Sequence, residues 1–161
     1  MGTFKRLQEI HKYLFQDVFE FAGEIRTVNI SKGNFRFTPI LFLKDNLKII
    51  DNMPDNSFDE MVEKYVEMNV AHPFREGNGR SMRIWLDLLL KEKLSSVVDW
   101  SKIDKQSYLS AMERSPVNSL EIKTLLKEAL TENIWDREVY MRGLQQSYYY
   151  EDLEKYNIAE L

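Results

Sequence analysis

The feature that most constrains the fold is a glycine-containing stretch, residues 72–83, which lies between two helical patterns. It reads His-Pro-Phe-Arg-Glu-Gly-Asn-Gly-Arg-Ser-Met-Arg. Before it, Ser57 and Glu60 have the spacing of a capping box, and the helix they predict should end before the proline, where helical geometry is disfavoured. After it, a leucine-rich run over 80–94 predicts a buried helix. Residues 73–79 are therefore expected to form a tight loop that leads into a helix N-terminus.

A loop of this kind carries the groups that bind phosphates. A helix N-terminus presents unpaired N–H groups and the positive end of the helix dipole. Gly77 and Gly79 allow the backbone to turn so that successive N–H groups point inward. Arg80 and Arg83 share one helical face, so both could reach the same polyphosphate. Glu76 is placed to hold Mg²⁺ together with phosphate oxygens.

His72 stands at the end of the first helix and is a candidate general base. A histidine with an ordinary pKa of about 6.5 suits that role near neutral pH. Taken singly, these features have common structural explanations, since a Gly-Asn-Gly segment is usually only a turn and a histidine before proline is more often structural. Their joint spacing is what makes the pattern specific.

The complete pattern, His-Pro-Phe-x-Glu-Gly-Asn-Gly-Arg-x-x-Arg, is the signature of the Fic family. The chain resembles that family over nearly its whole length, in particular the single-domain class III bacterial members of the Neisseria type. The resemblance implies a mostly α-helical bundle with one β-hairpin flap, in a single domain over residues 1–161. It also implies a protein adenylyltransferase, which transfers AMP from ATP to a Tyr, Thr or Ser hydroxyl of a target protein and releases pyrophosphate.

The resemblance assigns a role to each polar residue of the stretch. His72 would take the proton from the target hydroxyl, whose oxygen attacks the α-phosphorus. Glu76 would hold Mg²⁺ between the α- and β-phosphates. Arg80 and Arg83 would fix the β- and γ-phosphates. The loop itself would stabilise the charge that develops on the phosphates, through Gly77, Asn78 and Gly79. Phe74 is expected to be core packing that anchors the loop.

Residues 28–38 carry the only convincing strand pattern of the sequence. Apolar residues alternate on both sides of Lys32-Gly33-Asn34, which is typical of a β-hairpin. In the Fic family this hairpin is the flap, which covers the active site and holds an extended segment of the target by strand addition. Lys32 would approach the nucleotide from the flap. The alternative is a structural hairpin with a solvated lysine.

The rest of the chain predicts further helices. Thr3 is a candidate N-cap of a helix that reaches about Phe19, and His11 within it is expected to be a packed or partly exposed histidine without a chemical role. Apolar spacing predicts three more helices, over 41–50, 105–114 and 120–130.

The family resemblance places three more residues near the nucleotide. Asn69 lies in the last turn before His72, which would help to wall the pocket. Gln106 and Tyr108, near the start of the helix over 105–114, would lie beside the adenine. For Tyr108, an ordinary place in the core is equally consistent with the sequence.

The C-terminal segment carries a second family pattern. Class III members bear Ser/Thr-x-x-x-Glu-Gly/Asn on an inhibitory helix, which here would span about 145–157 with Ser147 and Glu151; Asp152 stands where Gly or Asn is usual. Glu151 would pair with Arg83 and occupy the group needed for the γ-phosphate, while Ser147 would hydrogen-bond nearby. The alternative is a solvated glutamate in a tyrosine-rich helix. The neighbouring tyrosine, Tyr148, is a candidate site of self-modification.

Composition argues against several other classes of protein. A chain of 161 residues suits one domain, and a net charge of −4 argues against a nucleic-acid-binding protein. The absence of cysteine excludes disulfides and thiolate metal sites. No apolar run approaches the ~18 residues of a membrane span, and the N-terminus lacks a signal-peptide pattern. A cytoplasmic protein is therefore expected.

Three alternative functions remain open at this stage. The transferred group could be phosphate or phosphocholine, although the intact Gly77-Asn78-Gly79 argues against the phosphate-transferring relatives. The reaction could run in reverse and remove AMP, with Glu151 positioning a water. A nucleotide-binding module without turnover is the least consistent with a complete signature. The sequence leaves open the target protein, association into homo-oligomers, and what relieves inhibition.

Overall fold

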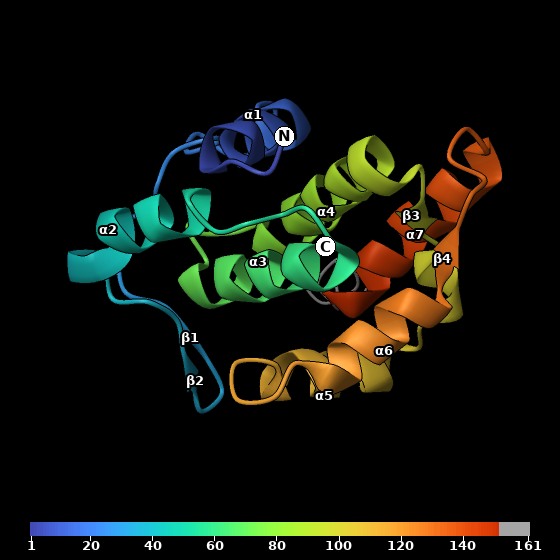
Figure 1. Ribbon diagram of the computed structural model, residues 1–161. Helices are drawn as coiled ribbons and strands as arrows, with labels where there is room; N and C mark the ends of the chain where they lie inside the picture. Colours follow the sequence, from blue (N-terminus) through green and yellow to red (C-terminus); the bar gives the residue numbers. More distant parts are fainter. Residues whose placement is uncertain (152–161) are drawn as a thin grey trace.

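The computed structural model describes residues 1–151, and these form a mostly helical bundle (Figure 1). The predicted fold class is therefore confirmed. Residues 152–161 lie outside the described part, and with them Asp152 and the second half of the helix predicted over 145–157. The α-helices of the described residues are α1 (Phe4–Phe15), α2 (Ile40–Asp51), α3 (Phe58–Ala71), α4 (Asn78–Leu94), α5 (Lys105–Arg114), α6 (Leu120–Glu128) and α7 (Arg137–Tyr150).

The core of the bundle lies around α3 and α4, which pack against each other at its centre (Figure 1). Helix α1 packs on α4, α2 packs on α3, and α7 packs on α4 and on a short 3₁₀ helix, η1 (Trp100–Lys102). Trp85 of α4 and Tyr65 of α3 are among the largest fully buried side chains. Burying one large apolar side chain contributes about 1.5–3 kcal/mol, so buried side chains of this kind hold α3 and α4, and with them the connection between the two helices, in place.

The capping prediction for α3 is confirmed at its N-terminus. The Ser57 hydroxyl accepts a hydrogen bond from the Glu60 N–H at 3.2 Å. The Glu60 carboxylate reaches one residue further back than a capping box requires, because it accepts from the Asn56 N–H at 3.0 Å. The helix ends at Ala71, immediately before His72, as the Pro73 position predicts.

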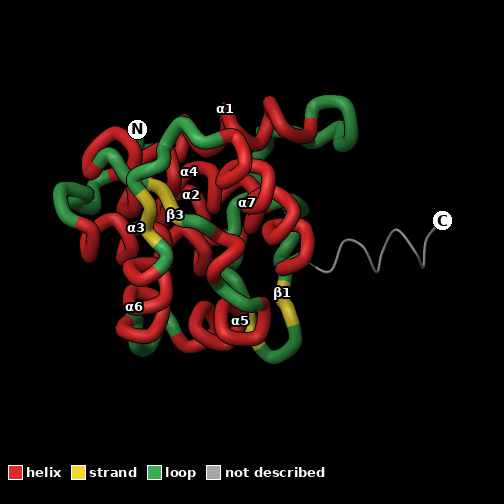
Figure 2. Tube along the Cα trace, turned by 90° about the vertical axis from the view of Figure 1, so that its right-hand side faces the viewer, coloured by secondary structure: helices red, strands yellow, loops and turns green. Residues whose placement is uncertain are grey.

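The β-hairpin is present but short, with β1 (Ser31–Lys32) and β2 (Phe35–Arg36) pairing antiparallel. Gly33 has a φ of 60°, which the tight turn between the strands requires. Figure 2 shows the strands as brief segments among the helices, with β1 on the side where α5 lies.

Two of the predicted helices end earlier than the sequence indicated. Helix α1 ends at Phe15 and not near Phe19, and Val18 beyond its end is exposed. The helix predicted over 120–130 ends at Glu128.

The hairpin over 28–38 is not the only pair of strands. The residues that follow α6 form β4 (Leu130–Thr131), which pairs antiparallel with β3 (Val97–Val98). A two-residue strand is too short to show an alternating pattern in the sequence.

Within the described residues, no helix combines the length and the apolar character needed to cross a membrane.

Candidate active site

The signature stretch forms the connection between α3 and α4, as predicted. Helix α4 begins at Asn78, two residues earlier than the apolar pattern indicated. The Asn78 side chain closes the loop, because its Oδ1 accepts from the Phe74 N–H at 2.9 Å and its Nδ2 donates to the Phe74 carbonyl at 2.6 Å. Phe74 is fully buried, as expected. Both polar atoms of the Asn78 side chain are thus used to close the loop. The groups left to contact phosphates would be the backbone N–H groups of the loop.

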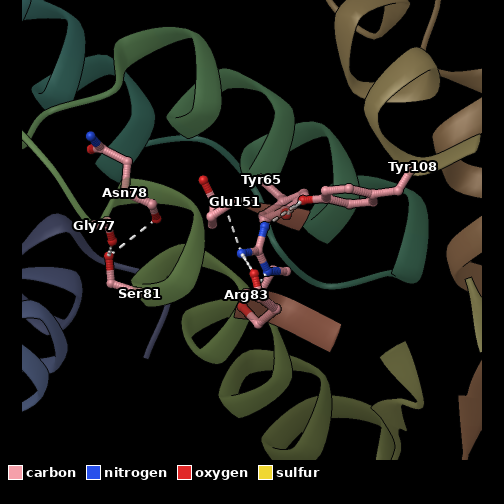
Figure 3. Close-up of polar contacts among 8 residues, drawn as sticks. Tyr65, Gly77, Asn78, Ser81, Arg83, Tyr108 and Glu151 are labelled. Atoms are coloured by element: carbon pink, nitrogen blue, oxygen red, sulfur yellow. Dashed lines mark hydrogen bonds and ion pairs between the residues drawn. The ribbon is translucent and has the colours of Figure 1, made fainter. Parts of the chain in front are cut away.

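Gly77 is required by both its conformation and its surroundings. Its φ of 83° is left-handed, and a Cβ at this position would lie 2.6 Å from the Phe15 ring of α1. The Ser81 hydroxyl donates to the Gly77 carbonyl at 2.8 Å and fixes the first turn of α4 (Figure 3). The loop is therefore held tightly from two sides at the point where the helix begins.

His72 has the tautomer of a general base. Its Nδ1 lies 3.0 Å from the Asn69 carbonyl, and because a carbonyl can only accept, Nδ1 carries the hydrogen and Nε2 keeps its lone pair. The ring stacks on Phe37, at the end of the hairpin, with 3.6 Å between centroids. Asn69 thus acts through its backbone, by fixing the orientation of the histidine.

The pKa of His72 differs from the ordinary value assumed from the sequence. Burial lowers it to about 4, although the hydrogen bond to Asn69 and the Glu151 carboxylate both act to raise it. The imidazole is therefore neutral at pH 7 and able to accept a proton.

Glu151 and Ser147 of the C-terminal segment bind Arg83, as predicted. Figure 3 shows the contact between Glu151 and Arg83. The Glu151 carboxylate accepts from the Arg83 guanidinium at 2.7 Å, and the Ser147 hydroxyl accepts from Arg83 Nε at 2.8 Å. Arg83 is 3% exposed. Burial alone would raise the pKa of Glu151, but the Arg83 cation outweighs it and holds that pKa below its usual range. The solvated-glutamate alternative is therefore wrong.

The Glu151 carboxylate lies directly over the first turn of α4. A Cβ built on Gly79 would overlap Glu151 Oε1 and would lie 3.0 Å from the Arg83 guanidinium. This is the place where a helix N-terminus and an arginine would bind an anion. The carboxylate of Glu151, the C-cap of α7, thus occupies the position at which the sequence predicts a phosphate.

We expect Gly79→Ala to destabilise the natural chain more than a Glu151→Gly chain. In the natural chain the new methyl group would push the carboxylate off Arg83, whereas without Glu151 that space is empty. Denaturation of the two single variants and the double variant should give a coupling free energy of about 1–3 kcal/mol.

Gly33→Ala is the matched control for that cycle. Gly33 has a left-handed φ, which Gly79 within α4 does not, so Gly33→Ala carries a backbone cost of its own, but a Cβ there would meet nothing within 4 Å. Its cost should be the same with and without Glu151. An equal cost of Gly79→Ala in both chains would contradict the placement of the carboxylate.

Tyr108 lies against Arg83, but Gln106 does not. The Tyr108 hydroxyl accepts from Arg83 at 3.3 Å and lies 2.5 Å from the Tyr65 hydroxyl (Figure 3). Its ring is buried and stacks on Tyr150 of α7, with 4.4 Å between centroids. Gln106 is exposed and donates to Ser110. The structure therefore gives Tyr108 the core position that the sequence left open.

Arg80 is held between two aromatic rings. Its guanidinium carbon lies 4.6 Å from the Phe15 ring centroid and 5.5 Å from that of Tyr148. Its Nε is buried without a hydrogen-bond partner among the described residues. Lys32 of the β1–β2 hairpin is exposed, yet its charge lowers the pKa of His72 and of Glu151. The positive charges of Arg80 and Lys32 therefore both contribute to the electrostatic potential around the signature loop.

Glu76 has the properties of a magnesium ligand that relies on a phosphate-bearing substrate. Its side chain is exposed beside the loop. The described residues contain no group of three His, Asp or Glu side chains that could hold a metal alone. Mg²⁺ commonly takes one or two carboxylates together with substrate phosphates, and a single carboxylate at a phosphate-binding loop fits that donor set.

His11 is a buried neighbour of the signature loop, and the sequence did not reveal its contact with Glu76. It is fully buried, its Nε2 donates to the Glu76 carbonyl at 2.7 Å, and its Nδ1 accepts from the Gly23 N–H at 2.9 Å. Its ring stacks on Phe74, with 3.8 Å between centroids. His11 is thus packed, as predicted, but it also fixes the backbone of the residue that would hold the metal. A single histidine without a patterned partner gives no such signal.

Comparison with known proteins agrees with this geometry. The family model described as the Fic/DOC family matches residues 3–90. The protein adenylyltransferase VbhT of Bartonella schoenbuchensis is 34% identical over 148 residues, which cover 83% of this chain and 30% of VbhT. The probable protein adenylyltransferase Fic of Salmonella typhimurium is 27% identical over 135 residues, which cover 76% of this chain and 67% of that protein. The chain therefore spans less than a third of VbhT and about two thirds of the Salmonella protein.

A solved structure shares the fold. The crystal structure of the BepC protein of Bartonella tribocorum, with bound AMPPNP, superimposes with a TM-score of 0.68 at 22% identity, covering 81% of this chain and 75% of that one. The family match covers more than half of the chain and includes the loop between α3 and α4. This chain belongs to the Fic/DOC family.

Proposed function

We propose that this chain is a protein adenylyltransferase, which transfers AMP from ATP to a hydroxyl of a target protein. The observation that carries the proposal is the neutral His72 at the loop that opens α4, with an Nε2 that has no hydrogen-bond partner among the described residues. Two relatives bear the name of this activity, and a protein of the same fold was solved with AMPPNP, an analogue of ATP.

In the proposed reaction, the target hydroxyl attacks the α-phosphorus while His72 Nε2 accepts its proton. A new bond forms between the hydroxyl oxygen and phosphorus, and the bond to the β-phosphate oxygen breaks, so the electron pair leaves with pyrophosphate. The backbone N–H groups of residues 77–79 stabilise the developing charge, and Arg80 and Arg83 hold the departing phosphates. Mg²⁺, held by Glu76 and phosphate oxygens, would supply further neutralisation of that charge.

We also propose that α7 holds the enzyme in an inhibited state. The contacts of Glu151 and Ser147 with Arg83 support this, because they use the guanidinium that the γ-phosphate would need. ATP would then bind only in an unproductive pose. The Fic domain in this proposal extends beyond residue 90 and includes α7.

The test is transfer of label from α-labelled ATP in Mg²⁺, comparing the natural chain with Glu151→Gly. Label should appear on lysate proteins or on the chain itself only with Glu151→Gly. Glu138→Ala is the matched control, since it removes a carboxylate from the same helix whose side chain is 83% exposed, and it should stay inactive. Absence of label in every variant, with ATP still bound, would sink the proposal and favour another donor nucleotide or a binding module without turnover.

Removal of AMP is a second candidate reaction, because the ionised Glu151 acts electrostatically on His72 and could orient a water. It would leave a free hydroxyl on the target and release AMP. A chain that removes AMP from a labelled protein only when Glu151 is present would favour this reaction over transfer.

Tyr148 is the proposed site of self-modification. It is 49% exposed and its ring lies beside Arg80. If this is correct, Tyr148→Phe in the Glu151→Gly chain should lose self-labelling and keep the labelling of lysate proteins. The flap at β1 and β2 is the proposed dock for the target, by strand addition.

A further inference from the structure

Arg26 is a buried arginine whose side chain, among the described residues, binds only backbone carbonyls. It is 5% exposed, and no carboxylate of the described residues pairs with it. Its Nε donates to the His72 carbonyl at 2.7 Å, and one terminal nitrogen donates to Val28 at 2.8 Å. The other terminal nitrogen donates to Ala71 at 3.0 Å and to Thr38. Burying a cation without a counter-ion is costly, so the four carbonyl contacts indicate that this side chain holds a specific arrangement of the backbone around it.

The four carbonyls come from two parts of the molecule, the C-terminus of α3 and the two ends of the β1–β2 hairpin. Ala71 and His72 lie at the C-terminus of α3, where carbonyls lack helical partners and a cation is favoured by the helix dipole. Val28 and Thr38 stand on either side of the β1–β2 hairpin. One guanidinium therefore joins both ends of the hairpin to the peptide of His72.

Other contacts place the hairpin over the same histidine. The Arg26 N–H donates to the Pro73 carbonyl at 2.9 Å, and the Thr38 N–H donates to the Val70 carbonyl at 3.0 Å. Phe37, next to Thr38, stacks on the His72 ring. The left-handed φ of 48° at His72 is unusual for a residue other than glycine and must be imposed by its surroundings. Arg26 is the side chain that binds the carbonyl of that residue.

We propose that Arg26 is a positioning residue that couples the flap to His72, so that a hydroxyl docked on the flap meets Nε2 in the correct geometry. This inference rests on the proposed transfer reaction and deepens it. Arg26 touches neither the first turn of α4 nor Arg80 and Arg83 in the contacts described above. Its replacement should therefore impair transfer to the acceptor while leaving ATP binding nearly unchanged.

The first test compares Arg26→Lys with the unchanged residue in the Glu151→Gly chain. Lysine keeps the charge but cannot reproduce the planar fork that reaches four carbonyls. We expect the transfer rate to fall by about 10²-fold, because a misplacement of about 1 Å has that effect, and the Kd for ATP to change by less than about threefold. Guanidinium ion added to Arg26→Ala should restore part of the rate.

Two physical readouts separate this role from general destabilisation and do not need transfer. Hydrogen exchange at the Phe37 and Thr38 amides should quicken in Arg26→Lys. The pKa of His72, followed by NMR, should rise from about 4 in Arg26→Lys, because a loosened hairpin exposes the ring and relieves the burial that lowers this pKa in the intact site, whereas the charge at position 26 is kept. The chain contains two histidines, which keeps that titration simple to assign.

Lys64→Met is the matched control, since Lys64 is a buried cation on α3 that pairs with Asp55 at 3.1 Å and binds no residue of the hairpin in the contacts described above. It should change neither the His72 pKa nor the flap exchange. Equal effects of Lys64→Met, or unchanged exchange and pKa in Arg26→Lys, would overturn the inference. In the natural chain, the Arg26 Nε–H should exchange slowly, and fast exchange would also overturn it. If Arg26→Lys shows these effects on hydrogen exchange and on the His72 pKa, but the Glu151→Gly chain transfers no label, only the proposed reaction is refuted.

Discussion

His72→Ala in the Glu151→Gly chain is expected to lower the rate of AMP transfer by about 10²–10⁴-fold, the usual contribution of a positioned general base. The histidine supplies Nε2 as the proton acceptor, and alanine supplies none. ATP binding should persist, because the phosphates are proposed to bind the backbone of the loop and the two arginines. The measurement is single-turnover transfer from α-labelled ATP, with the Kd for ATP determined in parallel.

The pH dependence of that rate tests the environment of His72. A histidine base with an ordinary pKa would lose activity as the pH falls below about 6.5. Burial lowers the pKa of His72 to about 4, so the base form persists to lower pH and the rate should stay level between about pH 6 and 8. Removing Glu151 should lower that pKa further, because its carboxylate favours the protonated ring.

His11→Gln is a useful comparison in the same assay. His11 is the other histidine of the chain and holds the Glu76 carbonyl. Its replacement should therefore alter the dependence of the rate on Mg²⁺ more than the fall of the rate at acidic pH, the acid limb of the profile. An acid limb near pH 6.5 that disappears with His72→Ala would contradict the buried, neutral state of His72. A rate unchanged by His72→Ala would refute its assignment as the base.

The loop and its two helices were predictable because their signals are local. Ser57 caps α3, Pro73 ends it, and glycine supplies the left-handed conformation at residue 77. These features depend on residue types only a few positions apart. The pair of Glu151 and Arg83 spans 68 residues of sequence, and only the family resemblance indicated it.

The supports of the loop could not be predicted in the same way. Arg26 and His11 bind backbone carbonyls, and a carbonyl has no residue identity that a sequence pattern could reveal. The expected pKa of His72 was wrong for a related reason, since it depends on burial by Phe37 and the rest of the fold. The candidate site residues could therefore be identified from the sequence, whereas the contacts and burial that set their properties could be seen only in the structure.

The competition between Glu151 and a terminal phosphate leads to a second large effect, on nucleotide selectivity. Glu151→Gly should tighten binding of ATP by about 10–100-fold, which corresponds to the 1.5–3 kcal/mol of a hydrogen bond to a charged group. Binding of ADP should change much less, because ADP has no γ-phosphate to take the place of the carboxylate. Calorimetric titration of the natural chain and Glu151→Gly with both nucleotides would measure the difference.

Arg83→Met, made in the Glu151→Gly chain, should remove this gain for ATP. That background is chosen because removing Arg83 alone would leave the Glu151 carboxylate partly buried without its cation, a change that typically costs about 3–5 kcal/mol and would confound binding with unfolding. Arg114→Met is the control, since that arginine pairs with Glu121 at the surface and should affect neither nucleotide. If ADP gained as much as ATP from Glu151→Gly, the carboxylate would be competing with a phosphate common to both, and the inhibited state would have to be reassigned from the γ- to the β-phosphate position.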